Sequence, residues 1–199
     1  IGFGFMFAPK YHSATRYVVP VRKALAVRTA FNFLGPLTNP AGATHQLIGV
    51  SDPDFQEVLA RALAELGTEH SMVVHGMDRL DELSATHATR VTEIRGSEIV
   101  THEVTPEDLG LETVEPGRFS AGTPDENAAT TRAILNGSDG PDRTLTIINA
   151  AAAIYVGGKA GSLADGVQLA TRSIDSGAAR DKLEQFVERS QLLAGQGNR

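Results

Sequence analysis

Two adjacent carboxylates, Asp81 and Glu82, are the residues in this sequence best suited to holding a metal ion. They follow a short apolar run that predicts a strand ending near Gly76. In open α/β sheets ligands collect at the carboxyl ends of strands. Mg²⁺ takes one or two carboxylates together with water and phosphate oxygens. The pair is therefore a candidate Mg²⁺ site, although a pair of this kind after a strand more often simply caps the following turn.

A second candidate is FNFLGPLTNP, residues 31–40, where Gly35 and Pro36 interrupt an apolar, helix-like run. Proline cannot donate to the helix ladder and biases the preceding residue away from the α region, so we expect the helix to stop here. Glycine lets another group approach the backbone without meeting a Cβ. The turn is either a plain helix stop or one wall of a ligand pocket.

Charge is divided unevenly along the chain. Residues 1–50 carry +5 and no acidic residue, and since the formal net charge is −6, this leaves −11 for the remainder. The basic segment, which contains His12 and Arg22, could hold a small anion. The acidic balance makes nucleic acid a poor partner. The absence of cysteine fits a cytoplasmic protein, and no apolar run approaches the roughly 20 residues of a membrane span.

Hydrophobic periodicity predicts a βαβ unit in residues 45–76. Residues 45–50 and 70–76 read as buried strands, and the helix between them begins at Asp52-Pro53 and ends at Gly67. Such a unit implies parallel strands with the helix on one face of the sheet. The face of the helix expected to be buried is Phe55, Val58, Leu59, Ala62, Leu63 and Leu66.

The rest of the chain predicts one hairpin and several helices. Residues 90–104 alternate around Gly96-Ser97, which favours an antiparallel hairpin. A helix with a break at Pro20 is expected over residues 13–34, and further helices over 124–136, 143–156, 162–174 and from 176 to about 193. The helix over 143–156 is almost wholly apolar and should be buried.

The fold class predicted from these elements is α/β, with a mixed, largely parallel sheet flanked by helices and remnants of a second, all-helical domain. We assign residues 1–12 to an entry strand and loop of the α/β domain, 13–40 to the small helical domain, and 41–199 to the α/β domain. Because the chain opens inside what reads as a structured element, we also expect residues upstream of Ile1.

No catalytic nucleophile is predicted. The sequence has no GxSxG elbow and no HExxH pair. GGKAGS, residues 157–162, lacks the spacing of a phosphate loop and reads as a connection between two helices.

Four motifs occur in an order that resembles the carboxyl-terminal part of the anthranilate phosphoribosyltransferase family. They are FMFAPKYH at 5–12, VRKALAVRTAFNFLGPLTNP at 21–40, HG..RLDELS at 75–84 and INAAAAIYV at 148–156. The resemblance implies a nucleoside phosphorylase/phosphoribosyltransferase-like fold. It also implies a cytoplasmic homodimer of tryptophan biosynthesis that joins anthranilate to phosphoribosyl pyrophosphate with Mg²⁺ and releases pyrophosphate. Catalysis would then rest on positioning and charge neutralisation, without a side-chain nucleophile.

The resemblance also implies roles for single residues. Arg22 matches the arginine that receives the anthranilate carboxylate, and Asp81 and Glu82 match the Mg²⁺ ligands. The residues that match the lining of the anthranilate pocket are Pro9, His12, Gly35 and Pro36.

Three departures from the family pattern stand out. Arg79 replaces a usual glycine and could pair with the carboxylates, and Ser13 replaces a usual proline. The family's glycine-rich phosphate loop and its Lys-His-Gly-Asn segment lie upstream of the residues present here. We therefore expect the 199-residue chain alone to be inactive.

Two alternatives remain open. A pyrimidine nucleoside phosphorylase resembles the same superfamily but would use phosphate and a nucleoside; the GPLTNP context and Arg22 argue against it. A non-catalytic, nucleic-acid-binding relative should show a basic groove, which the acidic remainder of this chain does not favour.

Overall fold

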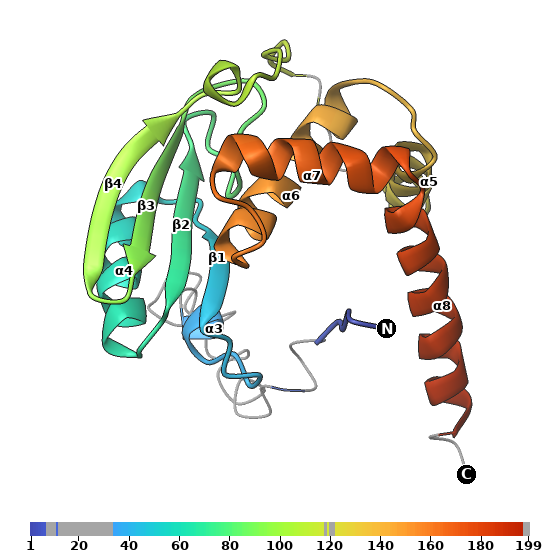
Figure 1. Cartoon of the computed structure of the whole chain (residues 1–199), viewed down its shortest axis with the longest axis horizontal. Coiled ribbons are helices and arrows are strands. Elements are labelled where there is room, and N and C mark those ends of the chain that lie inside the picture. The colour runs from blue at the N-terminus through green and yellow to red at the C-terminus, as the bar shows by residue number, and fades with distance from the viewer. Residues whose placement is uncertain (7–10, 12–33, 118, 120–121, 197–199) are drawn as a thin grey trace, which may run out of the picture. The chain divides into compact units, whose positions relative to one another are not determined.

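The structure is a computed structural model, and it describes residues 1–6, 11, 34–117, 119 and 122–196. The chain forms two compact units, Ile1–Ala43 with Glu184–Arg199, and Thr44–Leu183 (Figure 1). The helix expected over residues 13–34 lies almost wholly outside the described residues. The division into functional domains made from the sequence stays a prediction.

The predicted βαβ unit is confirmed in the second unit. Strands β1, His45–Gly49, and β2, His70–Gly76, pair in parallel. They are joined by a 3₁₀ turn, Pro53–Phe55, and helix α4, Gln56–Glu65. Strand β1 is less buried than expected, since only Ile48 among its residues is buried. The reason is that β1 lies at one end of the described strand order.

The predicted hairpin is also confirmed. Strands β3, Thr89–Arg95, and β4, Glu98–Val104, are antiparallel and complete a mixed sheet in the order β1-β2-β3-β4. Strand β2 pairs with β3 antiparallel as well. The described part of the sheet is therefore mixed but not largely parallel, because the loop 77–88 turns the chain back beside β2 without a crossover helix.

Helices cover both faces of this sheet (Figure 1). On one face Met72, Val74 and Val91 join a core cluster with α6, Pro141–Val156, and α7, Leu163–Asp175. Side chains alternate along a strand, so Val73, between Met72 and Val74, points to the opposite face, where α4 contacts β2 and β3. The core therefore has three layers, with the sheet in the middle.

The buried face of α4 differs from the prediction. Leu59 and Leu63 are buried as expected, but Val58 and Leu66 are 62% and 65% exposed. The difference arises at Gln56, which is fully buried and donates from Nε2 to the carbonyl oxygens of Val73 (3.1 Å) and Arg90 (2.9 Å). Because of these bonds, the face of α4 that packs on the sheet includes the polar residue Gln56. Hydrophobic periodicity alone does not identify a buried face that contains a polar residue.

Capping residues set the other helices much as the sequence indicates. The chain passes from β4 through a 3₁₀ turn, Glu107–Leu109, to α5, Pro124–Leu135, which begins with the capping box of Thr123 and Glu126. Ser162 accepts from the backbone N–H of Asp165 at the start of α7, and Ser176 accepts from that of Ala178 at the start of α8, Ala178–Gln196. The helix α6 places Ile147, Ile148, Ala151, Ala152 and Val156 in the core.

A polar network joins α6 to the sheet at the amino end of β2. Glu93 Oε1 is 2.8 Å from His70 Nε2, and it accepts from Arg95 Nε (3.0 Å) and from the hydroxyl of Tyr155 (3.0 Å). Burial opposes ionisation of Glu93, but the hydrogen bonds from His70 and Tyr155 and the charge of Arg95 outweigh it and lower its pKa. The ionised form of Glu93 therefore stabilises the fold.

Replacing this carboxylate should lower stability in a pH-dependent way. Because the pKa of Glu93 is lowered on folding, its contribution is present above the ordinary glutamate pKa and is lost as pH falls through the folded value. Glu93→Gln should cost about 2 kcal/mol of unfolding free energy at pH 7 in urea titrations, and the difference from wild type should shrink in acid. The control is Glu98→Gln at an exposed position in β4; an equal loss there would contradict the role of the network.

The first unit is described only in part. Residues 1–6 have no regular secondary structure, and Phe3 meets Phe186 of α8 edge to face with ring centroids 4.9 Å apart. The short helix α3, Leu34–Leu37, also belongs to this unit. Searching the described part of the chain finds no helix with the length and apolar character needed to cross a membrane.

Candidate metal and substrate site

The acidic pair lies on the loop 77–88, which leaves β2 at its carboxyl end. Asp81 is exposed and Glu82 is half-buried. The loop starts with a tight turn, in which the backbone N–H of Arg79 donates to the carbonyl of Gly76 (2.8 Å) and that of Gly76 donates to Leu80 (2.9 Å). The two carboxylates thus sit where ligands collect in open α/β sheets, as the sequence predicted.

Asp78 organises the first half of this loop. Its Oδ2 accepts from the hydroxyls of Ser84 (2.7 Å) and Thr86 (2.6 Å), and its Oδ1 accepts from the backbone N–H of Leu80 (3.4 Å). Burial alone would raise the pKa of Asp78, but the hydrogen bonds from Thr86, Ser84 and Leu80 outweigh it and lower the pKa. Asp78 is therefore held ionised, and its carboxylate oxygens are occupied by hydrogen bonds within the loop.

The surroundings of Glu82 have the opposite effect and favour its protonated form. Burial raises its pKa, and the negative charges of Asp81 and Asp78 raise it further. A hard divalent cation at the pair would relieve this repulsion, so the donor chemistry fits Mg²⁺. Among the described residues no group of three or more His, Cys, Asp or Glu side chains could hold a metal. The described residues would therefore supply two carboxylates, and other oxygens would have to complete the coordination.

Two glycines let the loop lie close to the sheet. A Cβ built on Gly49, the last residue of β1, would lie 1.5 Å from the carbonyl oxygen of Asp81. One built on Gly76 would lie 2.5 Å from Asp78 Oδ1. The backbone carrying the acidic pair thus packs directly on β1, where no larger residue fits.

Arg79 is the non-glycine residue with positive φ in the described chain, at 73°. This is the left-handed region, in which glycine meets no steric cost, and it explains why a glycine would suit this position. The side chain is exposed, and the pKa of Glu82 is raised by burial and by the charges of Asp81 and Asp78, with no lowering by a cation. The structure therefore gives no support for pairing of Arg79 with Glu82.

Replacing Arg79 with glycine should stabilise the fold. The left-handed conformation costs about 1 kcal/mol or more for a residue with a Cβ, and the extra chain entropy of glycine offsets part of the gain. We expect Arg79→Gly to raise the free energy of unfolding by about 0.5–1 kcal/mol in urea titrations. Arg79→Ala keeps the strain and removes the charge, so an equal gain in that variant would point to charge instead of backbone strain.

The predicted substrate-binding residues fall mainly outside the described part. Pro9, His12 and Arg22 are not described. Gly35 is exposed and has no described atom within 4 Å of a built Cβ, so its backbone is open to approach. Whether these residues meet the acidic pair stays a prediction, because Gly35 and Asp81 belong to different units.

Gly35 and Pro36 are described, but the end of the helix expected over residues 13–34 is not tested, because Leu34 alone of that range lies within the described residues. Both residues lie inside α3, and the turn follows at Thr38, whose backbone N–H and hydroxyl both donate to the carbonyl of Gly35 (3.2 Å each). Proline is tolerated in the first turn of a helix because the N–H that it lacks would have no partner there.

Sequence reasoning missed the residues that hold the loop, namely Asp78, Ser84, Thr86 and Asn149. Asn149, on α6, accepts from the backbone N–H of Leu83 and donates to its carbonyl, both at 2.9 Å. A signal was present, since Asn149 is the one amide in the apolar run INAAAAIYV. A lone polar residue on a buried helix usually has a specific hydrogen-bond partner.

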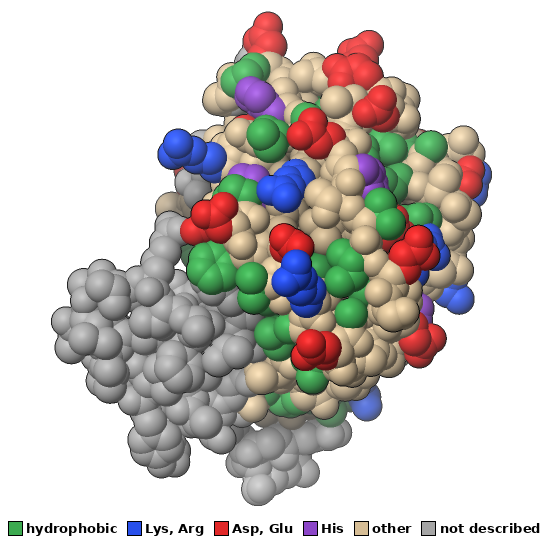
Figure 2. Space-filling model, turned by 90° about the vertical axis from the view of Figure 1, so that its left-hand side faces the viewer, with side chains coloured by type: hydrophobic (Ala, Val, Ile, Leu, Met, Phe, Trp, Pro, Cys, Tyr) green, Lys and Arg blue, Asp and Glu red, His purple; other side chains and the backbone are tan. Residues whose placement is uncertain are grey.

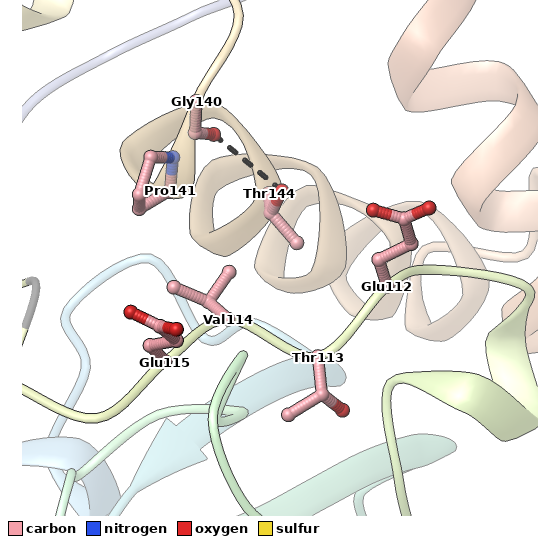
Figure 3. A pocket seen from close by; sticks show the side chains of 7 residues that line it. All are labelled: Glu112, Thr113, Val114, Glu115, Gly140, Pro141 and Thr144. Carbon is pink, nitrogen blue, oxygen red and sulfur yellow. Dashed lines mark hydrogen bonds between the residues drawn. The ribbon is translucent and has the colours of Figure 1, made fainter.

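A pocket of about 460 Å³ lies between the segment 112–115 and the first turn of α6 (Figure 3). Its described lining contains the carboxylates of Glu112 and Glu115 and no cationic side chain, so it does not suit a phosphate. The segment is tied to the loop 77–88 by the bond from Val114 N–H to the Ala85 carbonyl (2.8 Å). None of the residues predicted to bind substrate or metal lines this pocket.

Comparison with known proteins gives consistent results. Residues 1–180 match the model of the glycosyl transferase family, a/b domain. Among curated proteins, the chain is 49% identical over 199 residues to an anthranilate phosphoribosyltransferase of Methanosarcina acetivorans, covering all of this chain and 54% of that protein. The chain spans about half the length of the curated relatives it matches.

Solved structures agree with this match. The structure of anthranilate phosphoribosyltransferase from Thermus thermophilus superposes with a TM-score of 0.87 at 42% identity, over 94% of this chain and 55% of that one. The Saccharomyces cerevisiae enzyme, solved in complex with PRPP and Mg, superposes with a TM-score of 0.80 at 29% identity, over 89% and 51%. The family match, the identity along the chain and the shared fold together establish that this chain belongs to the glycosyl transferase family whose a/b domain it matches.

Proposed function

We propose that a protein of the relatives' length that contains this chain, called the full-length protein below, is an anthranilate phosphoribosyltransferase. The amine of anthranilate attacks C1 of phosphoribosyl pyrophosphate, so that a C1–N bond forms, the bond from C1 to the pyrophosphate oxygen breaks, and the amine loses a proton. The observation that carries the proposal is the 49% identity, over the whole chain, with a protein of that name.

In this proposal the basic first segment binds the acceptor. The Arg22 guanidinium would form a charge-assisted pair with the anthranilate carboxylate. Pro9, His12 and the open backbone at Gly35-Pro36 would line the pocket for the flat ring. No side chain attacks the substrate, so the rate enhancement would come from holding the amine against C1 and from stabilising the leaving group.

Asp81 and Glu82 would hold Mg²⁺ in the full-length protein. When bound, the ion would neutralise charge that develops on the departing pyrophosphate. Support comes from the raised pKa of Glu82, which reflects burial and then the negative charges of Asp81 and Asp78, and from the PRPP and Mg complex of the yeast relative. The loop itself would supply the fixed spacing between the two carboxylates.

We further propose that the full-length protein is a cytoplasmic homodimer that does not bind nucleic acid or membranes. On the face seen in Figure 2, acidic and basic side chains are interspersed and do not form a continuous basic field. Filter binding to single-stranded DNA at moderate salt tests this point. Retention of DNA at micromolar protein would favour the nucleic-acid-binding alternative.

The 199-residue chain alone should not turn over. The residues of this chain that are proposed to act in the reaction bind the acceptor and the metal, and none forms a glycine-rich phosphate loop. Purified chain in a coupled assay with anthranilate, phosphoribosyl pyrophosphate and Mg²⁺ should give no product above the blank. Measurable turnover would show that the chain binds the donor by itself.

A substrate panel tests the proposed reaction. The full-length protein should consume anthranilate in the presence of phosphoribosyl pyrophosphate, and it should leave thymidine and inorganic phosphate unchanged. Phosphorolysis of thymidine without consumption of anthranilate would reject the proposal in favour of the nucleoside phosphorylase alternative.

A further inference from the structure

We propose that Asn149 is a positioning residue that holds the acidic pair in the geometry needed to bind a divalent cation. The inference rests on the proposed role of Asp81 and Glu82 and assigns a further residue to the same site. Asn149 lies in the middle of α6, and the backbone that it holds, at Leu83, comes directly after Glu82.

The contact is unusually complete for one side chain. Asn149 Oδ1 accepts from the Leu83 N–H at 2.9 Å, and Nδ2 donates to the Leu83 carbonyl at 2.9 Å. The second hydrogen of Nδ2 donates to the carbonyl of Leu145, one turn earlier in α6, at 3.0 Å. Every donor hydrogen of the amide is therefore used, which fixes both the rotamer and the orientation of the amide.

The helix that carries Asn149 is itself rigidly placed. Its neighbours Ile148, Ala151 and Ala152 are at most 1% exposed and belong to the main core cluster. Leu83, at the other end of the contact, is fully buried in the same cluster. The amide thus fixes the loop at Leu83 relative to the core.

Other contacts fix the opposite side of the pair. Leu80 is held by Asp78 and by the turn at Gly76, and the carbonyl of Asp81 lies directly against Gly49 of β1. The backbone is therefore fixed before and after the two carboxylates, whereas the side chain of Asp81 remains exposed. This is the arrangement expected when side chains must meet a ligand at a set distance, since groups around metal ligands typically contribute tenfold or more to affinity.

If the loss of any such amide contact affected Mn²⁺ binding, the effect would not be specific to Asn149. The chain offers a matched control for this. Asn127 on α5 makes the same pair of contacts with one residue, accepting from the N–H of Gly122 (3.1 Å) and donating to its carbonyl (3.2 Å). That contact joins two exposed residues outside the loop 77–88. Asn127→Ala therefore removes an equivalent amide contact and leaves the loop 77–88 unchanged.

The test measures Mn²⁺ affinity of the 199-residue chain by electron paramagnetic resonance, with amide hydrogen exchange as a second readout. Asn149→Ala should weaken Mn²⁺ binding about tenfold or more and speed exchange at Leu83. Asn127→Ala should change neither. Asn149→Ser serves if the alanine variant does not fold, because its hydroxyl can bond the Leu145 carbonyl within the helix.

Asp81→Asn distinguishes an error in the positioning role of Asn149 from an error in the metal site itself. If Asp81→Asn abolishes Mn²⁺ binding while folded Asn149 variants bind like wild type, the positioning role is wrong and the metal site stands. An equal loss of affinity in Asn127→Ala would also overturn the positioning role. If Asp81→Asn binds Mn²⁺ as wild type does, the metal site itself is wrong, and the inference falls with it.

Discussion

Replacing Asp81 with Asn and Glu82 with Gln in the full-length protein is expected to lower phosphoribosyl transfer about a thousandfold at saturating Mg²⁺. The reason is that the leaving pyrophosphate would lose the cation that neutralises it, and such charge stabilisation contributes several kcal/mol. Initial rates of anthranilate consumption, followed by its fluorescence, measure the effect. Activity within tenfold of wild type would show that the pair does not hold the catalytic ion.

The same change should not destabilise the fold. Glu82 has a raised pKa, so its ionised form costs stability at neutral pH, and this cost is relieved as pH falls through the folded pKa toward the ordinary value. The melting temperature of the metal-free 199-residue variant should therefore equal or exceed that of wild type at pH 7. A loss of activity together with a lower melting temperature would mean that the carboxylates serve the fold instead of the site.

Gly49→Ala should have the largest effect on stability. Its Cβ would meet the Asp81 carbonyl oxygen at 1.5 Å, and because the Cβ position is fixed by the strand backbone and the oxygen belongs to the loop backbone, neither atom can rotate away. Overpacking of this kind costs about 3 kcal/mol, and relief would require the loop to move off β1. We expect this loss in urea unfolding, together with weaker Mn²⁺ binding.

Gly195→Ala is the matched control for this prediction. Gly195 lies in α8, its surroundings within 4 Å of a built Cβ are open, and alanine favours helix. It should leave stability unchanged or slightly higher. If Gly49→Ala is equally harmless, the packing of the acidic loop on β1 is not as described.

Local signals in the sequence were enough to predict most of the second unit. The Asp52-Pro53 helix start, the Gly96-Ser97 hairpin and the caps at Thr123, Ser162 and Ser176 depend on neighbouring residues only, and each is found in the structure. Local signals do not predict the order and direction in which strands pair, because these depend on where a loop returns the chain. Nothing local to residues 77–88 distinguishes an antiparallel return from a crossover.

The candidate site was predicted only where its chemistry shows in adjacent residues. Asp81-Glu82 is such a pair, and its place beyond β2 follows from the strand before it. The Asn149 contact joins residues 66 positions apart, so no window of the sequence contains both partners. The role of Gly49 likewise depends on a close approach by the backbone of Asp81, which lies far from it in the sequence.

We propose that Arg22 receives the acceptor and that Asp81 and Glu82 hold the metal. A crystal structure of the full-length protein with anthranilate, phosphoribosyl pyrophosphate and Mg²⁺ tests it most directly. The account predicts the Arg22 guanidinium on the anthranilate carboxylate, the ring against Gly35-Pro36, and Asp81 and Glu82 on Mg²⁺ in the same cleft. An Arg22 that points away from Gly35-Pro36, with no cleft leading to Asp81 and Glu82, would contradict it.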